Sequence, residues 1–582
     1  MGSFFKVFFA SLLALVIFSL IVLFFGVAVI GNIASKDKVK VEPKSVLTLD
    51  LGALFHEHVQ PSPLAALSDE GDVPALYEVQ RLLDYAKTDK DIAGIVIKAD
   101  GNANGFASSN ELRNSLLDFR KSGKFVIAQG DVMSQQAYFI ANAADKVYVN
   151  PSGALDWRGF SVAFPFVKGM LEKLEVETQI FYAGKYKSAT EIFRTDKMTP
   201  ENKLQTNEWL GDMYGYFLEQ TASARKLDTA SLHQLANNFS VQTPQDAVKY
   251  GLIDGLKYDD EVKDEIKKRL GIGKYDKLNY VTINKYKEAV TIRKGGSDRI
   301  AVIYAEGDIV DGAGSNTNIG GDNYRNMIRK VRLDPSVKAI VLRVNSGGGS
   351  ALASDNIWRE LQLARKDGKP IVVSFGDVAA SGGYYISCGA DSIFASPNTI
   401  TGSIGVFGII PNMSNFFRNK LGITFDGVTT APNADAGAIY RPLTETEKAF
   451  FQNGVERTYL QFKQRVAQGR KKDIAYVDSI AQGRVWSGSD ALRIGLVDRM
   501  GNLQDAINCA GRLAKLSSFG LKEYPEAPGF LDNLLGRHKT EPAVMLREQL
   551  GEQQFRVYQQ LLKVQEMTKG YQARMPFEII IQ

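Results

Sequence analysis

The sequence contains few of the residues that build disulfide frameworks, metal sites or nucleic-acid interfaces. Only two cysteines, Cys388 and Cys509, occur in 582 residues, which excludes a disulfide-stapled domain and a four-thiolate zinc site. Lysine and arginine exceed aspartate and glutamate by 70 − 65 = 5, and this excess is not clustered, so no nucleic-acid partner is predicted. The 45% hydrophobic and 23% charged residues are typical of soluble globular domains, which excludes a disordered chain or a polytopic membrane protein.

One long apolar run departs from this composition, at the N-terminus. No charged residue occurs from Val7 to Gly31, and at about 1.5 Å per residue such a helix spans a bilayer. The run is longer than the apolar region of a cleavable signal peptide, although residues 28–34 resemble a cleavage site. We therefore predict an uncleaved anchor with a single transmembrane helix over residues 1–35. Four lysines follow the run and one precedes it, so the positive-inside rule alone places the body in the cytoplasm.

The rest of the chain contains one module twice, with matches at a separation of about 245 residues. In each copy, short β-branched segments typical of buried strands alternate with helical patterns such as residues 76–86 and 354–364. This alternation predicts an α/β fold in each copy, around a largely parallel sheet. The corresponding segments are Asp91–Lys98 with Val337–Arg343, Lys124–Asp131 with Lys369–Asp377, and Ala247–Gly255 with Ala491–Asp498.

The duplication divides the chain into an anchor, two repeats and a tail. We predict a first α/β repeat over residues 45–285 and a second over residues 297–515, joined by the charged stretch Lys285–Arg299. The tail, residues 516–582, is expected to be partly helical because Met545–Met567 has a helical apolar pattern. It either packs on a neighbouring molecule as an oligomer contact or forms a simple surface helix.

The second repeat contains a turn that suits a nucleophile. The predicted strand 371–375 runs into residues 376–383 (G-D-V-A-A-S-G-G) and then a helical segment, which places Ser381 at a helix N-terminus. Free amides there favour a developing negative charge. In the first repeat Gln135 stands at this position. Close helix packing alone would explain an isolated A-S-G-G, but the preceding loop Asn345–Gly349 is permissive enough to present N–H groups to an oxyanion.

A nucleophilic serine needs a base, and no histidine lies in the second repeat. The four histidines are at positions 56, 58, 233 and 538, so a histidine-based triad is disfavoured. A lysine can replace histidine if it is neutral when it acts. Lys187 follows a predicted strand, Thr178–Tyr182, whereas the second repeat has no lysine in the corresponding residues 430–433. The repeats look complementary, because one contributes a base and the other a nucleophile.

The role of Lys187 depends on its burial. An exposed lysine has a pKa near 10.4, and desolvation without a carboxylate partner is what lowers it. We therefore expect Lys187 to lie between the two repeats with only hydroxyl neighbours. The alternative is that Lys187 is a solvated loop charge, which would be preferred in the absence of the complementary serine motif.

Four motifs in order carry a resemblance to a known family. They are G-K-Y-K-S-A at 184–189, N-S-G-G-G at 345–349, G-D-V-A-A-S-G-G-Y-Y at 376–385 and T-G-S-I-G at 401–405. Together with the anchor and the duplication, they resemble the long form of the signal peptide peptidase A family. The resemblance implies a crotonase-like or Clp-protease-like fold in each repeat. It also implies a membrane-anchored homotetramer that digests leftover signal peptides, with its catalytic body on the periplasmic side of the bacterial inner membrane.

The resemblance also assigns residues by motif match. Ser381 is the expected nucleophile, Lys187 the expected general base, and Ser403 the expected hydrogen-bond partner of that lysine. Trp157 stands at the position of Ser403 in the first repeat, and Asn345 stands where the family pattern leads us to expect an aspartate. The glycines expected at the oxyanion hole are Gly347, Gly348 and Gly382.

These observations predict a serine endopeptidase with a Ser/Lys dyad that cleaves apolar peptides and requires no metal or organic cofactor. Two other functions stay open at this point. Crotonase-like folds also use glycine loops as oxyanion holes in acyl-CoA enzymes, and a fold does not determine a function. A non-catalytic membrane scaffold would use the duplicated domains for assembly only. The sequence leaves open whether Lys187 meets Ser381 of its own chain.

Overall fold

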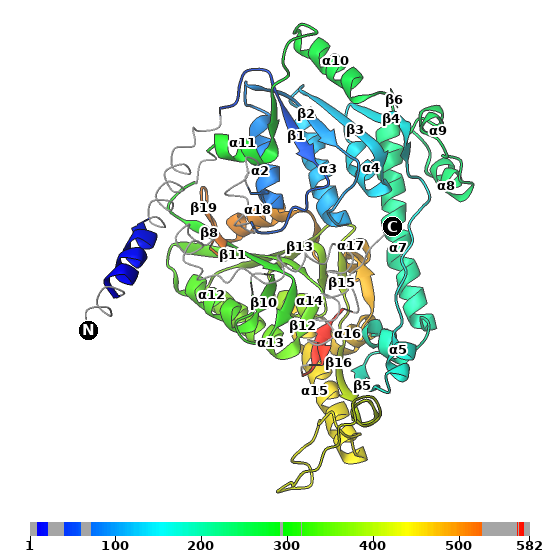
Figure 1. Ribbon diagram of the computed structural model, residues 1–582, viewed down its shortest axis with the longest axis vertical. Coiled ribbons are helices and arrows are strands. Elements are labelled where there is room, and N and C mark those ends of the chain that lie inside the picture. Colours follow the sequence, from blue (N-terminus) through cyan, green and yellow to red (C-terminus); the bar gives the residue numbers. More distant parts are fainter. Residues whose placement is uncertain are drawn as a thin grey trace.

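The computed structural model (Figure 1) describes residues 8–20, 40–59, 72–291, 295–315, 317–526, 567–568 and 570–575. Residues 8–20 are helical and lie at the edge of the molecule. Within the described ranges, no helix combines the length and the apolar character that crossing a membrane requires. The other residues of the predicted anchor, up to residue 35, and nearly all of the predicted tail helix, residues 545–566, lie outside the described residues.

The first repeat is built on a six-stranded sheet in the order β6-β4-β3-β2-β1-β7. All neighbouring strands in it are parallel. The apolar side chains of α10 cover one face, and the other face packs on α2, α3, α4 and α7. The strands are β1 (Ser45–Asp50), β2 (Ile92–Lys98), β3 (Phe125–Met133), β4 (Lys146–Leu155), β6 (Gly255–Leu256) and β7 (Tyr280–Thr282). The helices are α2 (Leu76–Ala86), α3 (Phe106–Arg120), α4 (Gln135–Ala141), α5 (Lys168–Lys173), α6 (Glu191–Arg194), α7 (Pro200–Arg225), α8 (Thr229–Asn237), α9 (Pro244–Lys249), α10 (Asp259–Leu270) and α11 (Ile283–Ala289).

The second repeat has the same plan, with an eight-stranded sheet in the order β17-β15-β13-β11-β8-β19, in which β14 also pairs with β13 and β18 pairs with β14. Helices α12, α13 and α14 pack on one face and α18 on the other. The strands are β8 (Arg299–Glu306), β11 (Val337–Ser346), β13 (Ile371–Ala380), β14 (Ser392–Ala395), β15 (Ile400–Gly402), β17 (Val485–Ser487), β18 (Arg499–Met500) and β19 (Gly520–Tyr524). The helices are α12 (Gly321–Leu333), α13 (Ala351–Lys366), α14 (Gly382–Ser387), α15 (Glu445–Arg470), α16 (Ile474–Ile480), α17 (Gly488–Arg493) and α18 (Leu503–Leu513).

A third sheet joins segments from both repeats and the tail, in the order β10-β9-β12-β20-β16-β5. Strand β5 of the first repeat pairs antiparallel with β16 of the second, and β20 of the tail lies between β12 and β16. This sheet therefore brings the segment before Lys187 to the second repeat. Its strands are β5 (Glu177–Ala183), β9 (Asp308–Val310), β10 (Asn318–Gly320), β12 (Gly348–Ser350), β16 (Val406–Asn412) and β20 (Gln572–Arg574).

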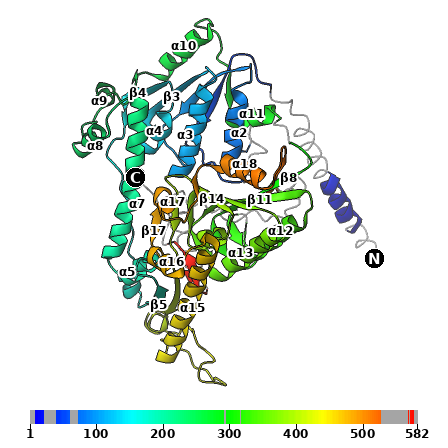
Figure 2. The same ribbon diagram turned by 180° about the vertical axis from the view of Figure 1, so that it is seen from behind.

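The two repeats lie one above the other in Figures 1 and 2, and the long helix α7 extends from the first repeat along the side of the second. The predicted α/β fold is confirmed, and the predicted strands before Lys187 and Ser381 are present as β5 and β13. Helix α11 contains the first residues of the predicted linker Lys285–Arg299, and strand β8 begins at its last residue.

Candidate active site

Lys187 of the first repeat and two serines of the second meet in the interior of the molecule. The Lys187 Nζ atom lies 2.9 Å from Ser381 Oγ, and it donates to Ser403 Oγ at 3.1 Å and to the Ser403 carbonyl oxygen at 3.2 Å. None of the three residues is more than 1% exposed. The three residues assigned by motif match are therefore in direct contact within one chain.

Ser381 is held at the turn between strand β13 and helix α14. Its backbone has φ 55° and ψ −113°, a conformation that costs a non-glycine residue roughly 1–3 kcal/mol and occurs mainly at functional sites. The Ser381 N–H donates to the Gly402 carbonyl oxygen at 2.8 Å, which ties the turn to the segment that contains Ser403. The strand-turn-helix arrangement directs the Ser381 side chain toward Lys187.

Lys187 lies in a loop that packs directly on the second repeat. A Cβ atom at Gly483 would lie only 2.7 Å from the Lys187 Cα atom, so the two backbones can approach this closely only because residue 483 is glycine. The Tyr186 N–H donates to the Gln482 carbonyl oxygen at 2.8 Å. Burial holds the pKa of Lys187 well below its ordinary value. Because desolvation is the one cause of this shift, the amine is favoured in its neutral form.

The predicted oxyanion glycines lie beside Ser381. Gly348 has φ +95°, and a Cβ atom there would lie 2.5 Å from the Gly382 nitrogen, so the two glycine backbones face each other at close range. The Gly348 N–H donates to Ser346 Oγ at 3.1 Å. Asn345, the departure from the family pattern, accepts a hydrogen bond from the Val378 N–H at 3.1 Å, which links this loop to strand β13, the strand before Ser381.

The tail lies along the same glycine loop, which the sequence did not indicate. Strand β20 pairs antiparallel with β12, with Ala573 opposite Gly349, and the Met575 N–H donates to the Gly347 carbonyl oxygen at 2.6 Å. A Cβ atom added at Gly348 would lie 2.1 Å from the Ala573 carbonyl oxygen, and one added at Gly382 would lie 3.0 Å from it. A short extended segment of the chain therefore occupies the space beside Gly348 and Gly382.

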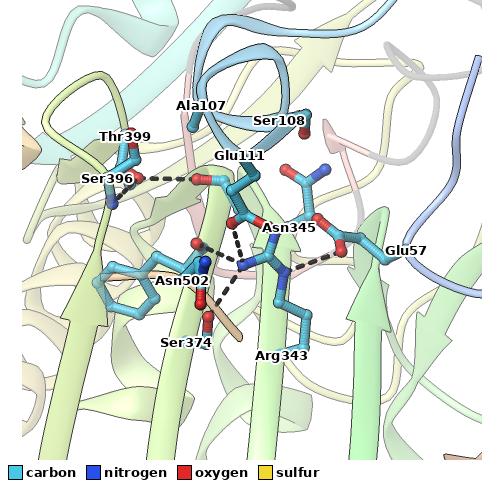
Figure 3. Close-up of polar contacts among 12 residues, drawn as sticks. Glu57, Ala107, Ser108, Glu111, Arg343, Asn345, Ser374, Ser396, Thr399 and Asn502 are labelled. Atoms are coloured by element: carbon cyan, nitrogen blue, oxygen red, sulfur yellow. Dashed lines mark hydrogen bonds and ion pairs between the residues drawn. The ribbon is translucent and has the colours of Figure 1, made fainter. Parts of the chain in front are cut away.

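A buried ion cluster joins the two repeats (Figure 3). Arg343 in β11 donates from Nε to Glu57 Oε2 and from Nη1 to Glu111 Oε1, both at 2.8 Å. It also donates at 2.9 Å to Ser374 Oγ and the Phe375 carbonyl oxygen in β13. Burial raises the pKa of Glu57 to about 7, although Arg343 opposes this shift. The cluster thus ties the first repeat to the two strands that lead to the glycine loop and to Ser381.

The family of the chain follows from its similarity to known proteins. Residues 118–273 and 363–517 match the model of peptidase family S49. The chain belongs to peptidase family S49. Its two S49 segments confirm the predicted duplication, and one falls in each repeat.

Curated S49 relatives extend over most of the chain. Protease 4 of Salmonella typhi is 38% identical over 492 residues, which are 83% of this chain and 79% of the relative. The chloroplastic serine protease SPPA of Arabidopsis thaliana is 32% identical over 489 residues, 82% of this chain and 70% of the relative. These relatives confirm the predicted resemblance to the long, duplicated form of signal peptide peptidase A, and this S49 chain is a serine protease.

Similarity to solved structures is lower. ClpP1 from Listeria monocytogenes is 15% identical and covers 35% of this chain and 92% of its own, with a TM-score of 0.23. The finer expectation of a crotonase-like or Clp-protease-like fold in each repeat stays a prediction.

Proposed function

We propose that this S49 serine protease is a membrane-anchored endopeptidase that uses Ser381 and Lys187 to degrade cleaved signal peptides and other apolar peptides. The observation that carries the proposal is the buried 2.9 Å contact between Lys187 Nζ and Ser381 Oγ. A neutral amine has two N–H groups and one lone pair. The N–H groups donate to the two oxygens of Ser403, and the lone pair accepts the Ser381 proton.

The catalytic cycle uses this pair twice. Lys187 takes the Ser381 proton as Ser381 Oγ attacks the peptide carbonyl carbon, and a tetrahedral intermediate forms. Lys187 then returns the proton to the leaving amine nitrogen as the C–N bond breaks, which leaves an acyl-enzyme. In the second half, Lys187 takes a proton from water, the hydroxide attacks the ester, and the Ser381 oxygen recovers a proton from Lys187. Backbone amides near Gly347, Gly348 and Gly382 are the proposed donors to the oxyanion.

The slot between β12 and β16 supports an extended peptide as substrate. Tail strand β20 shows the fit, because it adds to the β12 edge on one side and meets β16 on the other, as in recognition by strand addition. The Met575 side chain packs in the same apolar cluster as Ala380, Ile400 and Val485. A substrate strand in this place would direct apolar side chains into that cluster, which favours the apolar cores of signal peptides.

Location and assembly are part of the proposal. The uncharged run Val7–Gly31 supports a single-pass anchor, which would keep the site near substrates released from the bilayer. The resemblance to the signal peptide peptidase A family supports a body on the periplasmic side of the inner membrane and a homotetramer. A reporter enzyme that is active only in the periplasm, fused after residue 526, tests the topology, and the mass of the detergent-solubilised protein tests the tetramer.

Hydrolysis of an apolar signal-like peptide by wild type, Ser381→Ala and Lys187→Ala tests the reaction. We expect both variants to lose at least ~10³-fold in kcat/KM, because each removes one half of the nucleophilic pair. Equal turnover by all three proteins would reject the dyad. Turnover of an acyl-CoA ester that is unaffected by Lys187→Ala would favour an acyl-CoA enzyme instead.

A further inference from the structure

Gln205 in helix α7 contacts the residues on either side of Lys187. It is 1% exposed, and its Nε2 atom donates to the Tyr186 carbonyl oxygen at 3.2 Å and to Ser188 Oγ at 3.1 Å. These acceptors belong to the residues immediately before and after Lys187. One side-chain amide therefore holds the chain on both sides of the base without touching its amine.

The other end of the same amide reaches the second repeat. The Gln205 Oε1 atom accepts a hydrogen bond from the Val485 N–H at 3.0 Å. Val485 is opposite Gly402 in the antiparallel pair of β17 and β15, and Ser403 is the next residue after β15. Gln205 thus connects the loop of the base to the strand pair that presents Ser403.

Gln205 is itself held in a buried polar network. The Gln205 Nε2 atom also lies 3.2 Å from Asn202 Oδ1, and the Asn202 Nδ2 atom donates to Glu191 Oε2 at 2.9 Å. Glu191 Oε1 accepts from Thr199 Oγ1 at 2.6 Å. These contacts limit the rotamers of Gln205, since turning the amide would break hydrogen bonds that buried groups cannot replace with water.

The second repeat serves as an internal comparison for this position. Helices α7 and α15 both contain 26 residues and begin after a capping threonine, Thr199 or Thr444. At the separation of 245 that relates these two threonines, Gln205 corresponds to Phe450, which is 59% exposed. The helix does not need a glutamine there. The glutamine is present in the repeat that carries the lysine and absent from the repeat that lacks it.

We infer that Gln205 is a positioning residue for Lys187, which fixes the loop of the base against the strand pair of Ser403. The inference rests on the proposed role of Lys187 as the base. A lysine side chain has several rotatable bonds, so its amine meets Ser381 only if its backbone is held. A displacement of about 1 Å at a catalytic group can cost about 10²-fold in rate. A loosened loop also admits water, which raises the pKa of the amine toward that of an exposed lysine.

The test compares Gln205→Met with Gln220→Met in the full-length protein. Gln220 lies in the same helix and accepts a hydrogen bond from Arg113 at 3.2 Å, and Arg113 belongs to the core of the first repeat. For Gln205→Met we expect kcat to fall about 10- to 100-fold, with KM within about threefold because the slot between β12 and β16 is untouched. We also expect the acidic limb of the kcat/KM profile to move to higher pH. Gln220→Met should leave both unchanged.

The result that overturns the inference is a Gln205→Met enzyme whose kcat and acidic limb match those of Gln220→Met. If Gln205→Met does not fold, the same test uses Gln205→Glu. A glutamate carboxylate can still accept the hydrogen bond from the Val485 N–H, but it cannot donate one to the Tyr186 carbonyl oxygen. The upward shift of the acidic limb is again expected, and its absence again overturns the inference. Lys187→Ala in the same assay separates the two claims: activity in that variant rejects the dyad itself, whereas inactivity beside an unaffected Gln205 variant rejects only the positioning role.

Discussion

Gln135 opens helix α4 in the first repeat, and Ser381 precedes helix α14 in the second. The surrounding frame is shared, because Tyr138 and Tyr384 each donate a hydroxyl to a leucine carbonyl, at 2.6 Å and 2.9 Å. The two repeats therefore share this tyrosine contact but not the backbone of the turn, since Ser381 has φ 55° and Gln135 does not have a positive φ. Only the second repeat presents a serine side chain there.

The first repeat uses this place for structure instead. The Gln135 Oε1 atom accepts from the N–H groups of Arg158 and Gly159, at 3.0 and 2.9 Å. Trp157, at the position of Ser403, is buried and donates to the Leu232 carbonyl oxygen at 3.0 Å. The shared fold therefore supplies the strand, the following helix and its tyrosine contact, whereas the backbone of the turn and a few side chains differ between the reactive and the packed position.

The largest effect is expected when the serine is moved from the second repeat to the first. We expect Gln135→Ser combined with Ser381→Ala to stay at least ~10³-fold below wild type, because Trp157 stands at the position of Ser403 and residues 430–433, which correspond to the segment of Lys187, contain no lysine. Peptide hydrolysis by the double variant beside Ser381→Ala alone provides the measurement. Recovered activity in the double variant would mean that the first repeat already holds a usable base.

The contact between the repeats can be tested at Arg343. Replacing it with methionine leaves the buried carboxylates of Glu57 and Glu111 without a counter-charge, so we expect Arg343→Met to lower the free energy of unfolding by about 3 kcal/mol. Chemical denaturation monitored by fluorescence checks this value. The matched control adds Glu57→Gln and Glu111→Gln, which remove the charges and should restore most of the stability. If the triple variant is as unstable as Arg343→Met alone, the loss of stability comes from packing and not from unpaired charge.

A change at Ser403 tests the contribution of one side-chain hydrogen bond to Lys187. Ser403→Ala removes one hydrogen bond from Lys187 but keeps the backbone acceptor, so we expect kcat to fall about 10- to 100-fold, the loss that corresponds to a hydrogen bond to a polar or charged group. Ser403→Thr, which keeps the hydroxyl, is the control. Unchanged turnover of Ser403→Ala would remove Ser403 from the catalytic group.

We expect the smallest effect from a change in the tail, where β20 occupies the edge of β12 that a substrate strand would use. We expect deletion of residues 571–582 to lower the KM for an apolar peptide by about tenfold or less. The tail competes with the peptide for the site, so the apparent affinity of the intact protein is reduced by the fraction of molecules in which the site is free. A synthetic peptide of residues 570–575 added to the truncated enzyme should raise KM again. A higher KM after deletion would make β20 part of the binding site and not a competitor.

Much of this site was predictable from the sequence, and the missing parts share a physical reason. The sequence motifs predict Ser381, Lys187 and Ser403, and the strands before the first two follow from apolar segments of the right length. Gln205 lies in a helix without a motif, and only its internal counterpart Phe450 gives a signal. Strand β20 is three residues long, too short for a periodic pattern. Such contacts depend on how the two repeats pack, which local sequence does not encode.

The most direct measurement is the pH dependence of labelling of Ser381 by a serine-directed fluorophosphonate, in wild type and in Lys187→Ala. Burial favours the neutral form of Lys187, so the wild-type labelling rate should reach half its maximum at a pH well below about 10.4, the pKa of an exposed lysine. The Lys187→Ala rate should stay low throughout. A wild-type midpoint near 10.4, or equal rates in the two proteins, would contradict a buried neutral lysine as the base.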